Sequence, residues 1–223
     1  MIKAVLFDAD NTLYRISKSE AYDAQFAFLQ KATGIKKQRI KSEWEKVRDC
    51  LRSSPDPELR NRKYSTAAAL HRLEYDSPDC EKVATKSVDI FNERIVRNLK
   101  FDKENRTVLS QLRKKYRLAV ASDEFASFLK MKLNRALTDY RKYFSFIITP
   151  EKTKAMKPST AYYELAIKRL GMKAQEVMMV GDSWERDLKP AASMGMKTVL
   201  VGSRIEGKPN HWVKNIAELR RIL

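Results

Sequence analysis

The sequence is poor in the residues that form disulfide bonds or bind transition metals. It has two cysteines, Cys50 and Cys80, and two histidines, His71 and His211, among 223 residues. Two cysteines cannot supply the disulfide framework of a small secreted domain, and no cysteine–histidine cluster has the spacing of a zinc site. We therefore expect free thiols and no zinc centre.

Long apolar segments are also missing. Apolar runs such as residues 5–7 and 178–180 fall far short of the roughly 20 residues that cross a bilayer. The first three residues lead directly into a strand-like segment, which leaves no room for a signal peptide. With 43% hydrophobic and 33% charged residues, the chain has enough apolar material for a packed core. These features predict a cytoplasmic protein with no membrane partner.

Acidic residues are outnumbered by basic ones. The chain has 45 lysines and arginines against 28 aspartates and glutamates, a formal net charge of +17. The excess is spread along the chain rather than gathered in one tail. Such a surface attracts anions, and the default interpretation is a solvated basic face on an ordinary protein. Nucleic-acid binding is therefore kept as a second hypothesis.

Short apolar runs and helical stretches alternate over most of the chain. The runs are rich in β-branched and aliphatic residues and lack strict alternation, as is typical of strands covered by helices on both faces. The expected strands are residues 3–7, 117–122, 144–149, 177–180 and 197–201, and the expected helices lie near 103–115, 124–137, 159–170, 184–194 and 214–222. This alternation predicts an α/β fold with a doubly wound, Rossmann-like parallel sheet.

Residues 15–100 interrupt this alternation. They contain helical patterns near 18–33, 37–53, 57–75 and 79–98, with breaks at Gly34, at residues 53–57 and at residues 77–79. The sequence therefore predicts an α-helical domain, residues 15–100, inserted into an α/β core made of residues 1–14 and 101–223.

Two carboxylates follow the first expected strand, at Asp8 and Asp10, and Thr12 comes next in the same alternating pattern. Ligands of open α/β sheets bind beyond the carboxyl ends of the strands. One carboxylate can act there as nucleophile and metal ligand and the other as proton donor. A calcium loop is excluded, because Leu13 and Ser19 stand where it needs glycine and glutamate. A plain Asx turn is the structural alternative.

Further polar residues stand at the ends of other expected strands. Asp182 follows strand 177–180, and Asp187 lies on the first turn of the next helix. With Asp8 they offer the oxygen ligands that Mg²⁺ prefers, although helix capping would also explain them. Ser122 ends strand 117–122 and Asp123 follows it, where a hydroxyl and the next backbone N–H groups can hold a phosphate oxygen.

A lysine precedes the helix expected near residue 159. Pro158 suits the start of a helix and makes the residue before it extended, so Lys157 can direct its ammonium to the same site. An ordinary surface lysine is the alternative.

Taken in order, these residues resemble the four motifs of the haloacid dehalogenase-like (HAD) superfamily. The helical insert is similar to that family's first-position (C1) cap. The resemblance spans residues 2–202, and residues 181–202 most closely resemble the family's phosphatase branch. The residues that carry it are Asp8-x-Asp10-x-Thr12, Ser122, Lys157-Pro158 and Gly181-Asp182-x4-Asp187.

The resemblance implies a role for each acidic residue. Asp8 would attack phosphorus and become an aspartyl phosphate. Asp10 would protonate the leaving group, activate the hydrolytic water, and bind Mg²⁺ through its backbone carbonyl. Asp182 would complete the magnesium ligands, and Asp187 would support the metal directly or through another ligand. An acid at position 10 implies phosphate-ester chemistry, because family dehalogenases lack it.

The resemblance also implies how the substrate is held. Thr12, Ser122, Asp123 and Lys157 would contact or neutralise the phosphoryl group, and the cap would close over the substrate. Asp123 departs from the asparagine that often follows the motif serine, and it adds negative charge. The expected activity is a Mg²⁺-dependent phosphatase for a small phosphorylated metabolite, a nucleotide or a sugar phosphate. A phosphosugar mutase and a nucleic-acid-binding protein on the same scaffold are the alternatives.

Overall fold

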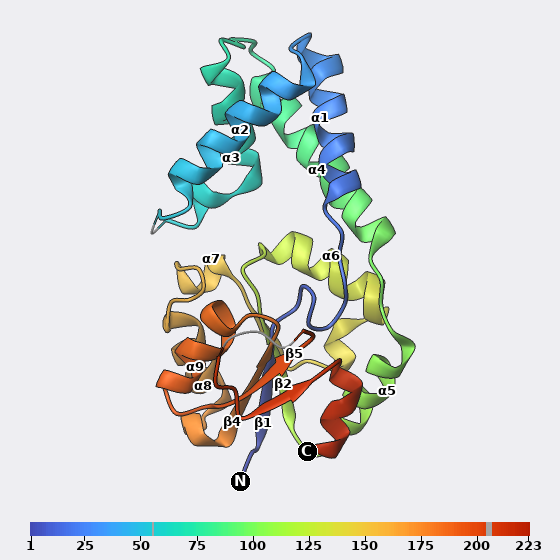
Figure 1. The fold of residues 1–223 in the computed structure, drawn as a ribbon, viewed down its shortest axis with the longest axis vertical. Coiled ribbons are helices and arrows are strands. Elements are labelled where there is room, and N and C mark those ends of the chain that lie inside the picture. Colours follow the sequence, from blue (N-terminus) through green and yellow to red (C-terminus); the bar gives the residue numbers. More distant parts are fainter. Residues whose placement is uncertain (55, 204–206) are drawn as a thin grey trace. The chain divides into compact units, whose positions relative to one another are not determined.

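A computed structural model describes residues 1–54, 56–203 and 207–223. The chain forms two compact units, one of residues 1–16 with 99–223 and one of residues 17–98. The first unit contains the sheet, and the regular elements described in the second unit are all helices (Figure 1). Residue 55, which belongs to the expected break at 53–57, lies outside the described residues.

Within the described residues the sheet has six strands, and every neighbouring pair is parallel. Its order is β3-β2-β1-β4-β5-β6. The predicted parallel sheet is therefore confirmed. From β1 the chain passes to β2 and β3 on one side of the sheet, and it then crosses to β4, β5 and β6 on the other side. This change of direction places a crevice at the carboxyl end of β1. The strands are β1 (Ala4–Phe7), β2 (Arg117–Ala121), β3 (Phe146–Ile148), β4 (Val177–Gly181), β5 (Lys197–Val201) and β6 (His211–Val213).

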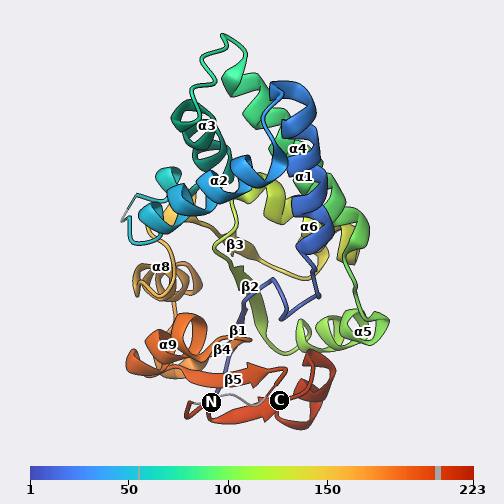
Figure 2. The same cartoon turned by 45° about the horizontal axis from the view of Figure 1, so that its top comes forward.

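Helices cover both faces of the sheet, so its central strands β1 and β4 are buried on both sides. Val5 and Phe7 of β1 belong to one core cluster, with residues of α5 and α6, whereas Ala4 and Leu6 belong to a second cluster, with residues of α8 and α9. Figure 2 shows α8 and α9 on one side of the sheet and α5 on the other. The helices are α5 (Lys103–Leu112), α6 (Ala126–Leu137), α8 (Ala161–Leu170) and α9 (Lys189–Ser193).

The structure differs from the sequence-based expectation at several short elements. β6 was not expected, and the four-residue helix α7 (Pro150–Thr153) was not expected either. The helix expected at 184–194 consists of a π-helical turn, Trp184–Leu188, followed by α9, and Pro190 stands in the first turn of α9. Proline has no N–H to continue the helix before it, which explains the new start. At the C-terminus, residues 216–221 form a 3₁₀ helix.

The helical unit has its own apolar core. Phe26 and Leu29 of α1 pack with Trp44 and Val47 of α2, so the helical stripes seen in the sequence form the core of this unit. Gly34 ends α1 in the left-handed conformation, φ 74°, which glycine adopts without strain. The helices are α1 (Ser19–Thr33), α2 (Lys37–Leu51), α3 (Arg62–Arg72) and α4 (Cys80–Asn98), with a 3₁₀ turn at Glu58–Arg60.

Both cysteines are free thiols: Cys50 is exposed and Cys80 is buried. Within the described residues, we find no helix with the length and apolar character needed to cross a bilayer.

Candidate active site

A tight turn after β1 folds the chain back over its first carboxylate. Asp8 is 8% exposed, and its backbone N–H donates to the carbonyl of Val180 on β4 at 2.8 Å. Asn11 has φ 62°, a conformation that asparagine tolerates better than most residues, and it lets the chain reverse. The Thr12 hydroxyl then donates to Asp8 Oδ2 at 3.1 Å. The turn thus holds the Asp8 carboxylate in one orientation.

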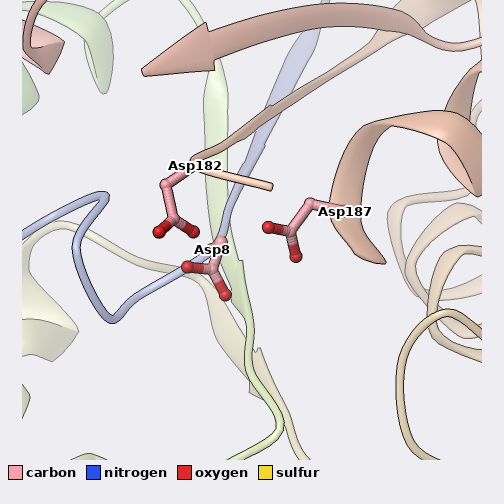
Figure 3. Close-up of side chains that lie close together, drawn as sticks. All are labelled: Asp8, Asp182 and Asp187. Atoms are coloured by element: carbon pink, nitrogen blue, oxygen red, sulfur yellow. The ribbon is translucent and has the colours of Figure 1, made fainter. Parts of the chain in front are cut away.

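Three carboxylates meet where β1 and β4 end. Asp8 lies at the tip of β1, Asp182 follows β4, and Asp187 lies on the π-helical turn. Figure 3 shows their side chains pointing toward one another, and one oxygen of each lies within 4.8 Å of the others. Gly181 permits this approach, because a Cβ there would lie 2.7 Å from Asp187 Cβ and 2.9 Å from its carboxylate carbon.

Burial and the charges of neighbouring carboxylates oppose the ionisation of Asp8 and Asp182. Burial raises the pKa of Asp8 to about 7; the charges of Asp187 and Asp182 add to this, against the lowering effect of Lys157. Burial, followed by the charge of Asp187, raises the pKa of Asp182 to about 6. Three carboxylates this close offer the hard oxygen ligands that fit a divalent cation such as Mg²⁺, which would offset their charge.

Lys157 provides the positive charge of the site. It is 3% exposed, and its Nζ lies 2.7 Å from Asp8 Oδ1 and 2.7 Å from Asp187 Oδ1. Burial lowers the pKa of Lys157, but the two carboxylates outweigh that effect, so the pKa is well above its usual value. Lys157 precedes Pro158 in the loop before α8, which begins at Ala161 rather than near residue 159.

Asp123 and Ser122 lie in the loop after β2. The Asp123 carboxylate accepts a hydrogen bond from the Lys157 backbone N–H at 2.8 Å and is paired with Arg186 of the π-helical turn. It therefore ties three loops together, and its charge is offset by Arg186. Ser122 is buried, and its Oγ accepts from the Glu124 N–H at 3.2 Å, which leaves its O–H free to donate.

Asp10 has separate surroundings. Its Oδ1 lies 2.5 Å from Nζ of Lys132, a fully buried lysine of α6. The nearby Tyr14 hydroxyl has a pKa well above its usual value, because of burial and then the negative charge of Asp10. The side chains of Asp8 and Asp10 therefore face different partners.

The structure thus brings Asp8, Thr12, Lys157, Asp182 and Asp187 into one network, and Asp123 joins it through the Lys157 backbone. Ser122 lies at the end of β2, beside β1 in the sheet, and no hydrogen bond in the described structure links its side chain to this network. Among the described residues, sequence reasoning missed two charged side chains that form ion pairs with the predicted ones, Arg186 and Lys132. Both lie on helices rich in other charged residues. Only their contacts with residues distant in the sequence distinguish them from ordinary surface charges.

The chain matches the family model described as haloacid dehalogenase-like hydrolase over residues 2–195. A glyceraldehyde 3-phosphate phosphatase of Methanopyrus kandleri is 29% identical over 202 residues, which are 90% of this chain and 84% of that protein. An enzyme of the same name from Methanocaldococcus jannaschii is 39% identical, but over 59 residues, 26% of this chain and 26% of its own length.

The fold also matches solved structures. A 2-haloacid dehalogenase from Pseudomonas syringae superposes with a TM-score of 0.76 at 23% sequence identity, covering 100% of this chain and 98% of that one. At this identity the likeness concerns the fold alone.

Proposed function

This chain belongs to the haloacid dehalogenase-like hydrolases, and from that premise we propose that it is a Mg²⁺-dependent phosphatase acting through an aspartyl phosphate on Asp8. The observation that carries the proposal is the buried network in which Asp8 is held by Thr12 and Lys157 and faces two further carboxylates. Phosphoryl transfer depends mainly on positioning and on neutralising charge, and this network provides both.

The reaction has two balanced steps. An Asp8 oxygen attacks phosphorus, the bond to the leaving oxygen breaks, and Asp10 gives that oxygen a proton. Water then attacks the phosphorus of the aspartyl phosphate while Asp10 takes back a proton, which releases inorganic phosphate and restores Asp8. Lys157 and the Ser122 hydroxyl would hold the phosphoryl oxygens, together with Thr12 and the backbone N–H groups that follow Ser122.

Asp123 contributes to this site indirectly in our proposal. Its carboxylate holds the Lys157 backbone and Arg186, so its charge is offset before a phosphate approaches. Asp8, Asp182 and Asp187, with the Asp10 backbone carbonyl, would hold the Mg²⁺. The cation would neutralise the charge that builds up between these carboxylates and the phosphate.

The substrate class follows from the relatives and the charge. The Methanopyrus and Methanocaldococcus relatives are named glyceraldehyde 3-phosphate phosphatases, and a net charge of +17 favours anionic substrates. We therefore propose a small sugar phosphate, with glyceraldehyde 3-phosphate as the first compound to test, and nucleotides as the second group. The helical unit would act as the cap that selects the non-reacting part of the substrate.

A panel of sugar phosphates and nucleotides with Mg²⁺, read as inorganic phosphate released, tests this function. We expect turnover of at least one sugar phosphate by the wild type and none by Asp8→Asn. A sugar phosphate that is isomerised without phosphate release would identify a mutase. Strong salt-dependent retention on a DNA column, with no phosphatase activity, would favour the nucleic-acid-binding alternative.

A further inference from the structure

A lysine of the α/β unit is completely buried beside Asp10. Lys132 is 0% exposed, and its Nζ lies 2.5 Å from Asp10 Oδ1 and 3.5 Å from Glu124 Oε1. Lysine is among the residues least often buried, and burial requires that its charge be paired. The ammonium group is therefore placed at Asp10 at a cost in desolvation that an exposed lysine avoids.

The packing of α6 leaves this side chain few other positions. Leu129 and Leu133, on either side of Lys132 in the sequence of α6, are buried in the core of the sheet unit. The Lys132 Nζ also lies 4.5 Å from the ring centroid of Phe128 and 5.9 Å from that of Tyr14. Aromatic faces attract cations, so two rings and two carboxylates surround the ammonium.

The pair also restrains Asp10. Asp10 lies in the turn after β1 and Lys132 lies on α6, 122 positions later in the sequence. The ion pair ties this turn to a helix that is fixed by the core. A free aspartate can rotate about its side-chain bonds, and a displacement of about 1 Å in a reacting group can reduce a rate by about 10²-fold. The restraint acts on the carboxylate that exchanges protons in the proposed reaction.

We propose that Lys132 is a positioning residue for proton transfer by Asp10. The proposal rests on the proposed function, in which the Asp10 carboxyl gives its proton to the leaving oxygen as the bond to phosphorus breaks. Lys132 holds Oδ1 and so orients the carboxyl group for this transfer. It neither gains nor loses a proton and does not touch the substrate.

The test compares two leaving groups by kcat/KM, which covers the steps up to leaving-group departure. p-Nitrophenolate departs with little need for a proton, whereas the alkoxide of glyceraldehyde 3-phosphate must be protonated. In Lys132→Met we expect kcat/KM to fall by about 10–100-fold for glyceraldehyde 3-phosphate and by less than about 3-fold for p-nitrophenyl phosphate. The matched control is Lys130→Met, because Lys130 is exposed on the same helix; it should leave both values unchanged.

A double variant keeps the test decisive if Lys132→Met folds poorly with Asp10 unpaired. Asp10→Asn/Lys132→Met removes both charges, and it should be no slower on either ester than Asp10→Asn alone, because Lys132 acts through Asp10. Lys132→Arg keeps the charge and should move the ratio of the two kcat/KM values back toward wild type.

Two results would overturn the positioning role of Lys132 and leave the proposed function intact. One is an equal loss on both esters in Lys132→Met, and the other is a further loss when Lys132→Met is added to Asp10→Asn. Either would mean that the lysine serves only the stability of the fold. A wild-type protein that hydrolyses neither ester would overturn the proposed function and this role with it.

Discussion

Replacing Asp8 with asparagine is expected to stabilise the metal-free protein at alkaline pH while it abolishes catalysis. Asp8 is 8% exposed, and burial together with the charges of Asp187 and Asp182 opposes its ionisation more strongly than Lys157 favours it. The result is a pKa of about 7 instead of 3.8. Asparagine has almost the same shape and no charge, so the substitution removes the repulsion and keeps the packing.

The pH range of the effect follows from the direction of this shift. Between the two pKa values, folded Asp8 holds a proton that the unfolded chain has released, so stability falls as the pH rises. The shift from 3.8 to about 7 corresponds to a loss of about 2 kcal/mol at pH 5 and about 4 kcal/mol at pH 8. The variant avoids this loss, so its advantage should grow by about 2–3 kcal/mol over that range.

Denaturant unfolding in EDTA, at pH 5 and pH 8, measures this advantage directly. Adding Mg²⁺ at pH 8 should reduce it, because the cation offsets the same repulsion in the wild type. The control is Asp89→Asn, because Asp89 is exposed on α4, and it should show no advantage that grows with pH. An equal advantage at both pH values, or a less stable Asp8→Asn at pH 8, would refute the reasoning that burial outweighs the pairing with Lys157.

Two further predictions concern the metal. EDTA should abolish turnover and Mg²⁺ should restore it, whereas Ca²⁺ should substitute poorly because its coordination is larger and looser; full turnover in excess EDTA would remove the metal from the mechanism. Gly181→Ala should push Asp187 away from Asp8, since the new Cβ would lie 2.7 Å from Asp187 Cβ. We expect the Mg²⁺ concentration for half-maximal rate to rise about 10-fold or more, and an unchanged Mg²⁺ dependence would show that Asp187 plays no part in binding.

Most of the sheet could be predicted because its buried strands are continuous apolar runs. Such runs can be recognised in the sequence without knowing which strand pairs with them. Residues 4–7 and 177–181 are continuous apolar segments, each followed by turn residues, and both form strands near the expected limits. β6 could not be predicted in this way, because His211 and Trp212 are exposed and the strand exists through pairing with β5. A three-residue strand has too little periodicity to be detected in a sequence.

The candidate site also has residues that could be predicted from the sequence and residues that could not. Asp8 and Asp182 follow recognisable strands, and parallel strands bring their ends to one edge of the sheet. Lys132 gave no such signal, because it lies on an amphipathic helix beside Lys130 and Arg135 and its partner is 122 positions away. The position of Asp123 was visible, but its link to Arg186 depends on the π-helical turn, which the sequence did not indicate.

The most direct test of the central claim is to trap the phosphoenzyme. Asp10→Asn keeps the nucleophile but lacks the base that activates water, so hydrolysis of an aspartyl phosphate should slow by about 10²–10⁴-fold. Mixed with p-nitrophenyl phosphate and Mg²⁺, this variant should release a burst of about one p-nitrophenolate per site. Mass spectrometry after acid quenching should then find one phosphate on the peptide that contains Asp8. No burst, no covalent phosphate, or a phosphate on another residue would contradict the proposal.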